Sequence, residues 1–165
     1  ITTFQSGTPC DIYEPTDRAV INSSGQRPDY VGGTVEFFVP RETGAVAGRP
    51  NSWFDGTGGG SSTLAANPFF RRVGSGESWA LGAGRYGNFG RNVFRGPGLN
   101  NWELGAFKRF PITEGHVVQF RAEFFNAFNH TQFNSPNTNV ASANFGRITT
   151  ARDPRLVQLT LKYTF

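Results

Sequence analysis

The strongest constraint on the fold is a strict alternation of apolar and polar side chains over residues 157–165. The apolar positions are Val157, Leu159, Leu161, Tyr163 and Phe165. Because successive side chains of a strand point to opposite faces, this period of two predicts an amphipathic β-strand. The dipeptide Asp153-Pro154 just before it suits the start of a strand. The five apolar positions therefore predict the face along which this strand assembles with a neighbour.

Two earlier segments, 101–110 and 116–128, show the same period. The predicted apolar faces contain Trp102, Leu104 and Ala106 in the first segment, and Val118, Phe120, Ala122 and Phe124 in the second. The predicted polar face of the second segment contains Gln119, Arg121 and Glu123, which we interpret as part of a cross-strand ionic ladder. A short turn over residues 110–115 predicts an antiparallel hairpin, and the Asn-rich stretch 129–144 predicts a long loop.

The second of these segments also permits a helix. Phe120, Phe124 and Phe128 are spaced by four residues and would form a stripe along one helix face. Val117-Val118 and the adjoining turn favour a strand, because β-branched residues suit a pleated sheet.

The first part of the chain is rich in turn-forming residues. Most of the 21 Gly and 10 Pro lie before residue 99, and only residues 1–4, 18–21 and 34–39 resemble strands there. We therefore divide the chain into a loop-rich region with short strands, 1–98, and an antiparallel strand region, 99–165. The predicted fold class is all-β, with a few long amphipathic antiparallel strands, long Gly- and Pro-rich loops and an open sheet.

The tetrapeptide Asn-Phe-Gly-Arg occurs twice, at residues 88–91 and 144–147. Each copy precedes a breaker and then an alternating segment. This arrangement favours a repeated structural unit of loop, bend, breaker and strand, with a chance match as the alternative.

The composition and the motifs of the sequence argue against several classes of function. The net charge of +4 comes from scattered Lys and Arg residues, which disfavours nucleic acid as a partner. Residues 82–87 match a nucleotide-binding glycine motif, but the Gly and Pro residues after it disfavour the helix that such a site needs. No nucleophile-elbow motif is present, so we expect no enzyme activity and no cofactor.

A metal site is not expected either. Cys10, His116 and His130 are the only soft ligands and stand in unrelated contexts. Asp11, Glu14 and Asp17 could offer oxygens to calcium, but we interpret them as a solvated acidic loop.

The strand region resembles a known family. The matching residues are NWEL at 101–104, QFRAEFFN at 119–126, FNH at 128–130, NFGRIT at 144–149, ARDPR at 151–155 and the terminal Phe165. They resemble the C-terminal end of TonB-dependent outer-membrane receptors, notably the acidobacterial type with a carboxypeptidase-regulatory-like domain. The resemblance is dense over residues 85–165 and looser upstream. It implies a location in the outer membrane or at the cell surface of a Gram-negative bacterium, a lumen-facing polar side of the strands, and a role for Phe165 as an assembly signal.

The number of strands limits what this chain can do alone. Barrels of this type close with about 22 strands, whereas this sequence offers about four, so its sheet must be completed by a neighbouring chain. The partner is either other copies of itself or the remainder of a receptor barrel. We favour a structural subunit that self-assembles by strand addition into an extracellular fibre or sheet, because the chain starts abruptly at Ile1 and suggests a processed segment. The alternative is the closing strands of a TonB-dependent nutrient importer.

Overall fold

The computed structural model describes residues 1–16, 25–38, 51–60, 64, 67–73 and 85–165, which form two compact units. Unit 1 comprises Ile1–Ser6, Gly98–Phe133 and Ala151–Phe165, and unit 2 comprises Gly7–Pro97 and Asn134–Thr150. All regular elements of the described residues are strands, and their sheets are open, as the sequence predicts. No helix in this part of the chain is long and apolar enough to cross a membrane.

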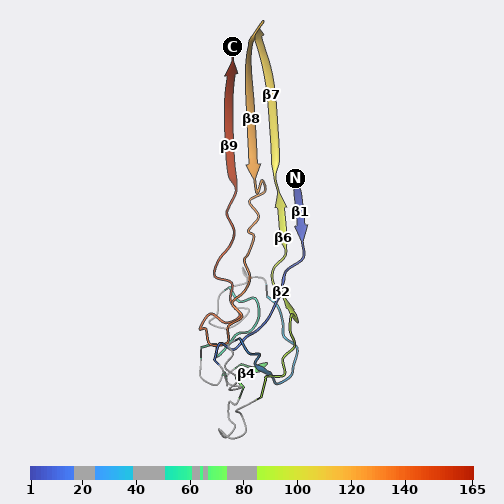
Figure 1. The fold of residues 1–165 in the computed structure, drawn as a ribbon, viewed down its shortest axis with the longest axis vertical. Coiled ribbons are helices and arrows are strands. Elements are labelled where there is room, and N and C mark those ends of the chain that lie inside the picture. Colours follow the sequence, from blue (N-terminus) through green and yellow to red (C-terminus); the bar gives the residue numbers. More distant parts are fainter. Residues whose placement is uncertain (17–24, 39–50, 61–63, 65–66, 74–84) are drawn as a thin grey trace. The chain divides into compact units, whose positions relative to one another are not determined.

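Unit 1 contains the long strands. Its strands are β1 (Thr2–Gln5), β6 (Leu99–Trp102), β7 (Leu104–Thr113), β8 (His116–Phe125) and β9 (Leu156–Thr164). Strands β7, β8 and β9 form an antiparallel sheet in that order, and β1 pairs with β6 in a second antiparallel sheet. Figure 1 shows the three long strands side by side, with the C-terminus at the end of β9.

The hairpin turn between β7 and β8 is shorter than predicted. It consists of Glu114 and Gly115 alone, and Gly115 has a φ of 86° that suits glycine. The predicted turn over residues 110–115 is wrong at its start, because Phe110 and Pro111 still pair with β8, with a register shift after Pro111. Proline can lie in β7 because β7 is an edge strand, where one row of backbone N–H groups needs no ladder partner.

The segment that permitted a helix is a strand over His116–Phe125. Phe120 pairs with Lys108 on one side and Leu161 on the other, so β8 satisfies its backbone through both neighbours. The strand ends at Phe125, and the next residue, Asn126, has a φ of 50° in the left-handed region. Phe128 therefore lies beyond the strand, and the helical stripe is not formed.

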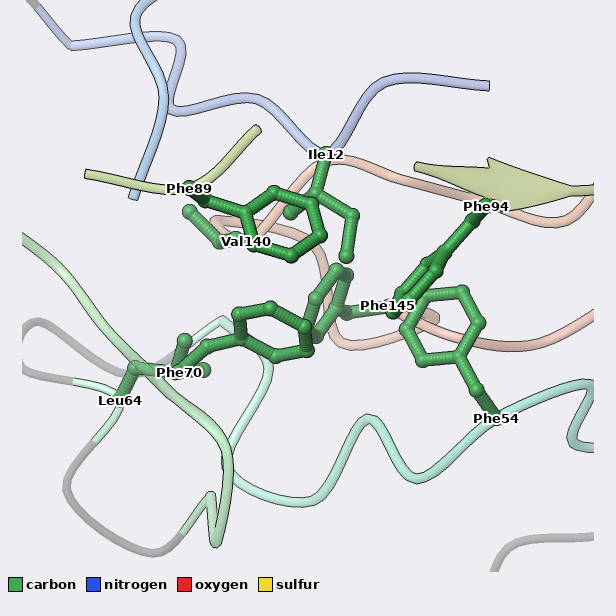
Figure 2. Packing of buried hydrophobic residues seen from close by; sticks show 8 residues of the cluster. All are labelled: Ile12, Phe54, Leu64, Phe70, Phe89, Phe94, Val140 and Phe145. Carbon is green, nitrogen blue, oxygen red and sulfur yellow. The ribbon is translucent and has the colours of Figure 1, made fainter. Parts of the chain in front are cut away.

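Unit 2 is built from very short strands around an aromatic core. Its strands are β2 (Pro9–Cys10), β3 (Asp29–Tyr30), β4 (Phe70–Arg71) and β5 (Phe94–Arg95), which pair as β2 with β5 and β3 with β4. The core residues are Ile12, Phe54, Leu64, Phe70, Phe89, Phe94, Val140 and Phe145 (Figure 2). Ring centroids lie 5.1 Å apart for Phe70 and Phe89 and 5.2 Å apart for Phe54 and Phe145. These edge-to-face contacts hold together segments that have little ladder pairing.

The predicted short strands have different outcomes. The first becomes β1 at Thr2–Gln5. The second, at 18–21, lies outside the described residues. Of the third, at 34–39, residue 39 lies outside the described residues, and the rest contributes only an isolated antiparallel bridge between Phe37 and Phe54.

The two Asn-Phe-Gly-Arg copies share a packing role. Phe89 and Phe145 are both buried in the core of unit 2. Their glycines differ, because Gly146 has a φ of 79° whereas Gly90 is outside the left-handed region. A Cβ on Gly146 would also lie 2.6 Å from the carbonyl oxygen of Phe54. Each copy therefore buries its own phenylalanine ring in the core, and the backbone at the glycine that follows differs between the two copies.

The two units change over at Pro97 and Gly98, close to the sequence division after residue 98. Two segments belong to the unit formed mainly by the other part of the chain. Ile1–Ser6 belongs to unit 1 because β1 pairs with β6, and Asn134–Thr150 belongs to unit 2, where Phe145 enters the core.

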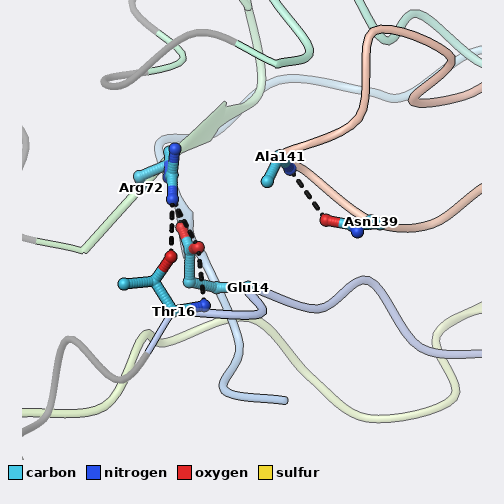
Figure 3. A network of polar contacts seen from close by, with 5 residues as sticks. All are labelled: Glu14, Thr16, Arg72, Asn139 and Ala141. Atoms are coloured by element: carbon cyan, nitrogen blue, oxygen red, sulfur yellow. Dashed lines mark hydrogen bonds and ion pairs between the residues drawn. The ribbon is translucent and has the colours of Figure 1, made fainter. Parts of the chain in front are cut away.

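A buried ion pair ties two distant segments of unit 2 together. Arg72 donates through Nε to Glu14 Oε2 and through Nη2 to Glu14 Oε1 at 2.6 Å (Figure 3). Thr16 joins the network through its hydroxyl, which accepts from Arg72 Nη2 at 3.0 Å, and its backbone N–H, which donates to Glu14. The Glu14 side chain is 0% exposed. The interpretation of this stretch as a solvated acidic loop is therefore wrong for Glu14, because an arginine 58 residues away in the sequence neutralises it.

Asp11, in the same stretch, has other partners at the surface. Asp11 accepts a hydrogen bond from the backbone N–H of Asn92 and lies 3.6 Å from Arg91 at the surface. Asp17 lies outside the described residues. A separate polar contact in Figure 3 is local, since Asn139 Oδ1 accepts from the backbone N–H of Ala141 at 2.9 Å.

The aromatic core gives a first prediction. Phe145→Ala removes a fully buried ring that contacts Phe54, and we expect unit 2 to lose about 3–5 kcal/mol of stability. Limited proteolysis and near-ultraviolet circular dichroism would report the loss. Tyr86→Ala is the control, because Tyr86 is an exposed aromatic residue of the same unit. Equal protease resistance of the two variants would contradict the assigned core.

The buried ion pair gives a second prediction. Arg72→Met removes the positive charge that pairs with the buried Glu14 carboxylate, and we expect a loss of about 3–5 kcal/mol in the free energy of unfolding. The double variant Glu14→Gln/Arg72→Met should recover part of that loss in denaturant titrations. Arg91→Met, which breaks only an exposed pair, should cost about 1 kcal/mol or less. A double variant that is less stable than Arg72→Met would show that the pair does not dominate the energetics here.

Candidate functional site

The register of β7, β8 and β9 gathers the predicted apolar positions on one face of the sheet. Residues paired directly across antiparallel strands lie on the same face. Four rows cross the three strands: Leu104, Phe124 and Val157; Ala106, Ala122 and Leu159; Lys108, Phe120 and Leu161; Phe110, Val118 and Tyr163. Eleven of these twelve side chains are apolar or aromatic, so the face is a continuous apolar surface with Lys108 as its exception.

This apolar face is uncovered by the described residues. The side chain of Leu161 is 72% exposed and that of Leu159 is 64% exposed, although both lie in the middle of β9. Only Ala122, at the centre of the sheet, is buried. An exposed apolar surface of this kind marks a site of contact with lipid or with another protein surface.

The opposite face, called the polar face below, carries the predicted residues Gln119, Arg121 and Glu123, with Phe107, Pro111 and Val117 as its apolar exceptions. Arg121 donates to Glu123 Oε1 at 2.6 Å, and this ion pair runs along β8. The predicted cross-strand ladder is wrong for Glu123, because its cross-strand neighbours are the uncharged Gly105 and Gln158.

Two further cations lie on this polar face. Gln119 pairs with Arg109 on β7 and with Lys162 on β9, so a cation lies on each side of it. The polar face of the sheet therefore carries more positive than negative charge, with Glu123 as the one acidic residue among its paired positions.

Aromatic residues mark both ends of the apolar face. At one end Trp102, the last residue of β6, contacts the rings of Phe4 and Phe128, with centroids 6.0 Å and 5.5 Å away. At the other end Tyr163 shares a hydrogen bond of 2.6 Å with His116 and stacks on its ring. Tyr and Trp side chains with a polar atom are typical of membrane interfaces.

Two of the predicted apolar residues lie outside the four rows. Trp102 belongs to β6, one residue before β7 begins. Phe165 follows the end of β9, is 88% exposed, and has its ring centroid 5.8 Å from that of Tyr163. Sequence reasoning did not assign Phe4, His116 or Phe128 to this surface, because their neighbours come from strand register and ring contacts that periodicity does not encode.

The potential metal ligands of the described residues are dispersed. Cys10 lies in β2, His116 in β8 and His130 in the loop after β8, and the described residues contain no group of three potential metal ligands. Of the glycine motif at 82–87, residues 82–84 lie outside the described residues. Burial, with the neighbouring Asp11 charge, raises the pKa of the Cys10 thiol above its usual range. A raised pKa leaves little thiolate at neutral pH, so Cys10 is a weak nucleophile.

Comparison with known proteins agrees with this geometry. A family model described as an outer membrane beta barrel domain matches residues 1–158. Neither the curated proteins nor the solved structures give a match. Since the family match covers nearly the whole chain, the protein belongs to the outer membrane beta barrel domain family and is located in the outer membrane of a Gram-negative bacterium.

Proposed function

We propose that β7, β8 and β9 are a section of the wall of an outer-membrane barrel, and that they are the closing strands of a TonB-dependent nutrient importer. The observation that carries the proposal is the uncovered apolar face backed by a polar face on the same three strands. Strands of membrane barrels alternate in this way, with apolar side chains toward lipid and polar side chains toward the lumen.

The strand lengths support this placement. Strands β7, β8 and β9 contain 10, 10 and 9 residues, which lies within the usual length of a transmembrane β-strand. A strand of this length extends about 34 Å, and a tilt of about 40° reduces its height to about 26 Å. The apolar band of an outer-membrane barrel has about the same height. The aromatic groups around Trp102 and Tyr163 would then lie near its two edges.

Lys108 is compatible with a lipid-facing surface. It lies one row from Phe110 and Tyr163, which are in the row nearest the β7–β8 turn. A lysine has a long apolar stem, so its ammonium group can reach the membrane interface while the stem stays among apolar side chains.

The connections also fit an outer-membrane barrel. The β7–β8 turn is short, whereas the connection from β8 to β9 runs from residue 126 to residue 155. Barrels of this class have short periplasmic turns and longer extracellular loops. In this proposal Glu114 and Gly115 face the periplasm. The importer assignment itself rests on the resemblance of the β6–β8 sequence and of Phe165 to TonB-dependent receptors.

Open strand edges support a second candidate function. Strands β7 and β9 are the outer strands of their sheet, and within the described residues no strand pairs with their free edges. Strand addition between copies would satisfy those edges and, because the contact need not close, would give filaments. The protein would then be a structural subunit of an extracellular fibre, with the apolar faces buried between copies.

A matched pair of substitutions tests the assignment of the faces. Leu159→Lys places a charge in the second row of the apolar face, and we expect a cost of about 2–4 kcal/mol if that face meets the middle of the bilayer. Thr160→Lys, one residue further on the polar face, should have little effect. The measured quantity is the fraction of protein in the outer membrane that migrates as a folded, heat-modifiable species. Similar fractions for the two variants would mean that the faces are assigned wrongly.

Electron microscopy separates the two functions. A barrel wall predicts discrete particles that need detergent for solubility, because a closed barrel leaves no strand edge free. Self-assembly predicts filaments that persist without detergent and disappear when residues 161–165, the second half of β9, are deleted. Detergent-dependent particles would exclude the fibre, and deletion-sensitive filaments would exclude the importer.

A further inference from the structure

Unit 2 contains a cavity that lies apart from the strands of the apolar face. Its volume is about 460 Å³, which is in the range of small-molecule sites. The residues that matter for its chemistry are Tyr30, Phe37, Asn88, Phe89, Val93 and Phe94, all of them in unit 2.

The floor of the cavity is fixed by the aromatic core. Phe89 and Phe94 are buried, and their ring centroids lie 5.4 Å apart. Phe94 also meets the ring of Phe37 edge to face at 5.1 Å. Because these rings pack against each other and against the core, the floor of the cavity is already formed before a ligand binds.

The rim is apolar as well. Phe37 is 47% exposed and Val93 is 57% exposed, so both offer apolar surface to an incoming molecule. A site with a buried aromatic floor and an exposed apolar rim gains free energy from any apolar ligand that fills it.

The side-chain polar atoms of Tyr30 and Asn88 are already engaged within the protein, and Thr34 adds one hydroxyl group to the lining. Asn88 Oδ1 accepts from the backbone N–H of Tyr30 at 2.6 Å, and Asn88 Nδ2 donates to the Tyr30 carbonyl at 3.3 Å. The Tyr30 hydroxyl donates to the Gly33 carbonyl. Few side-chain donors or acceptors are left for a ligand.

The lining also determines which ligands would be rejected. It contains no Asp, Glu, Lys, Arg or His, so a charged group would lose its hydration without gaining a counter-charge. A sugar would leave most of its hydroxyl groups without partners, which carries a similar penalty for each. An uncharged ring loses no such interaction and gains contact with the aromatic walls.

We propose that this cavity binds an uncharged, ring-containing small molecule with few hydroxyl groups. The proposal goes beyond the barrel function and is independent of it, because every residue that carries it lies in unit 2.

Ligand-observed saturation-transfer NMR with the purified full chain in lipid nanodiscs tests the proposal. The probe is 2-naphthol, which is uncharged at neutral pH; naphthalene-2-sulfonate has the same rings with a charge, and methyl glucoside represents the sugars. We expect saturable binding of 2-naphthol and at least tenfold weaker binding of the other two. Absence of saturable naphthol binding, or equal binding of the sulfonate, would overturn the proposal.

Two substitutions locate the binding. Val93→Trp should fill the cavity from its rim and weaken naphthol binding at least tenfold. Val31→Trp is the matched control, because Val31 is another exposed valine of unit 2 that does not line the cavity. Partition into lipid is the same for both variants and cancels in the comparison. Equal naphthol affinity of the two variants would place the binding elsewhere and contradict the proposal.

Folding and membrane insertion are checked on the same samples. Near-ultraviolet circular dichroism shows whether Val93→Trp keeps its aromatic core. Phe37→Leu provides a second variant, because it keeps apolar volume at the rim but removes one ring, and it should also weaken naphthol binding. Heat-modifiable migration reports barrel formation separately. Loss of barrel formation with naphthol binding retained would refute the proposed function alone, and the reverse result would refute the ligand site alone.

Discussion

Backbone hydrogen bonding in an apolar medium is the constraint on which the structure depends. A strand whose side chains face lipid cannot leave its N–H and C=O groups unpaired, because no water is present to bind them. Strand β8 meets this requirement by pairing along its length with β7 on one side and β9 on the other. Within the described residues, β7 and β9 are paired on one side only, so the proposed barrel wall needs further strands at their outer edges. The alternation of side chains, the apolar rows and the need for a partner all follow from this one requirement.

Unit 2 also has to provide partners for its backbone N–H and C=O groups, but it does so with side chains. Its strands are only two residues long, so side chains replace the missing ladder bonds. Asn67 is fully buried and uses its whole amide: Oδ1 accepts from the backbone N–H groups of Phe69 and Phe70, and Nδ2 donates to the carbonyls of Asp55 and Thr57. A buried polar group that is fully satisfied in this way fixes the path of the chain. Aromatic rings then supply the apolar contacts that a longer sheet would supply elsewhere.

Local sequence patterns predict the long strands, whereas contacts between distant residues determine the buried ion pair and the cavity. The period of two at Val157 to Tyr163 is a property of adjacent residues, so it indicates a strand without further information. Alternation predicts the hairpin for the same reason, but the predicted turn over 110–115 is too wide, because Phe110 and Pro111 still pair with β8. The Glu14–Arg72 pair and the cavity were not predicted. Each joins residues that are far apart in the sequence, and periodicity carries no information about such contacts.

The pairing of the first residues with β6 has a consequence for the order of folding. The backbone of Ile1 bonds to that of Glu103 in both directions, across 102 positions of the chain. Closing a loop of that length costs about 4 kcal/mol of chain entropy, whereas the β7–β8 hairpin closes across two residues and forms in about 1–10 μs. We therefore expect the hairpin to form first and β9 to join it next, across the shorter connection. Strand β1 would dock last, so residues 1–5 pair with a strand, β6, that is already held next to the folded hairpin.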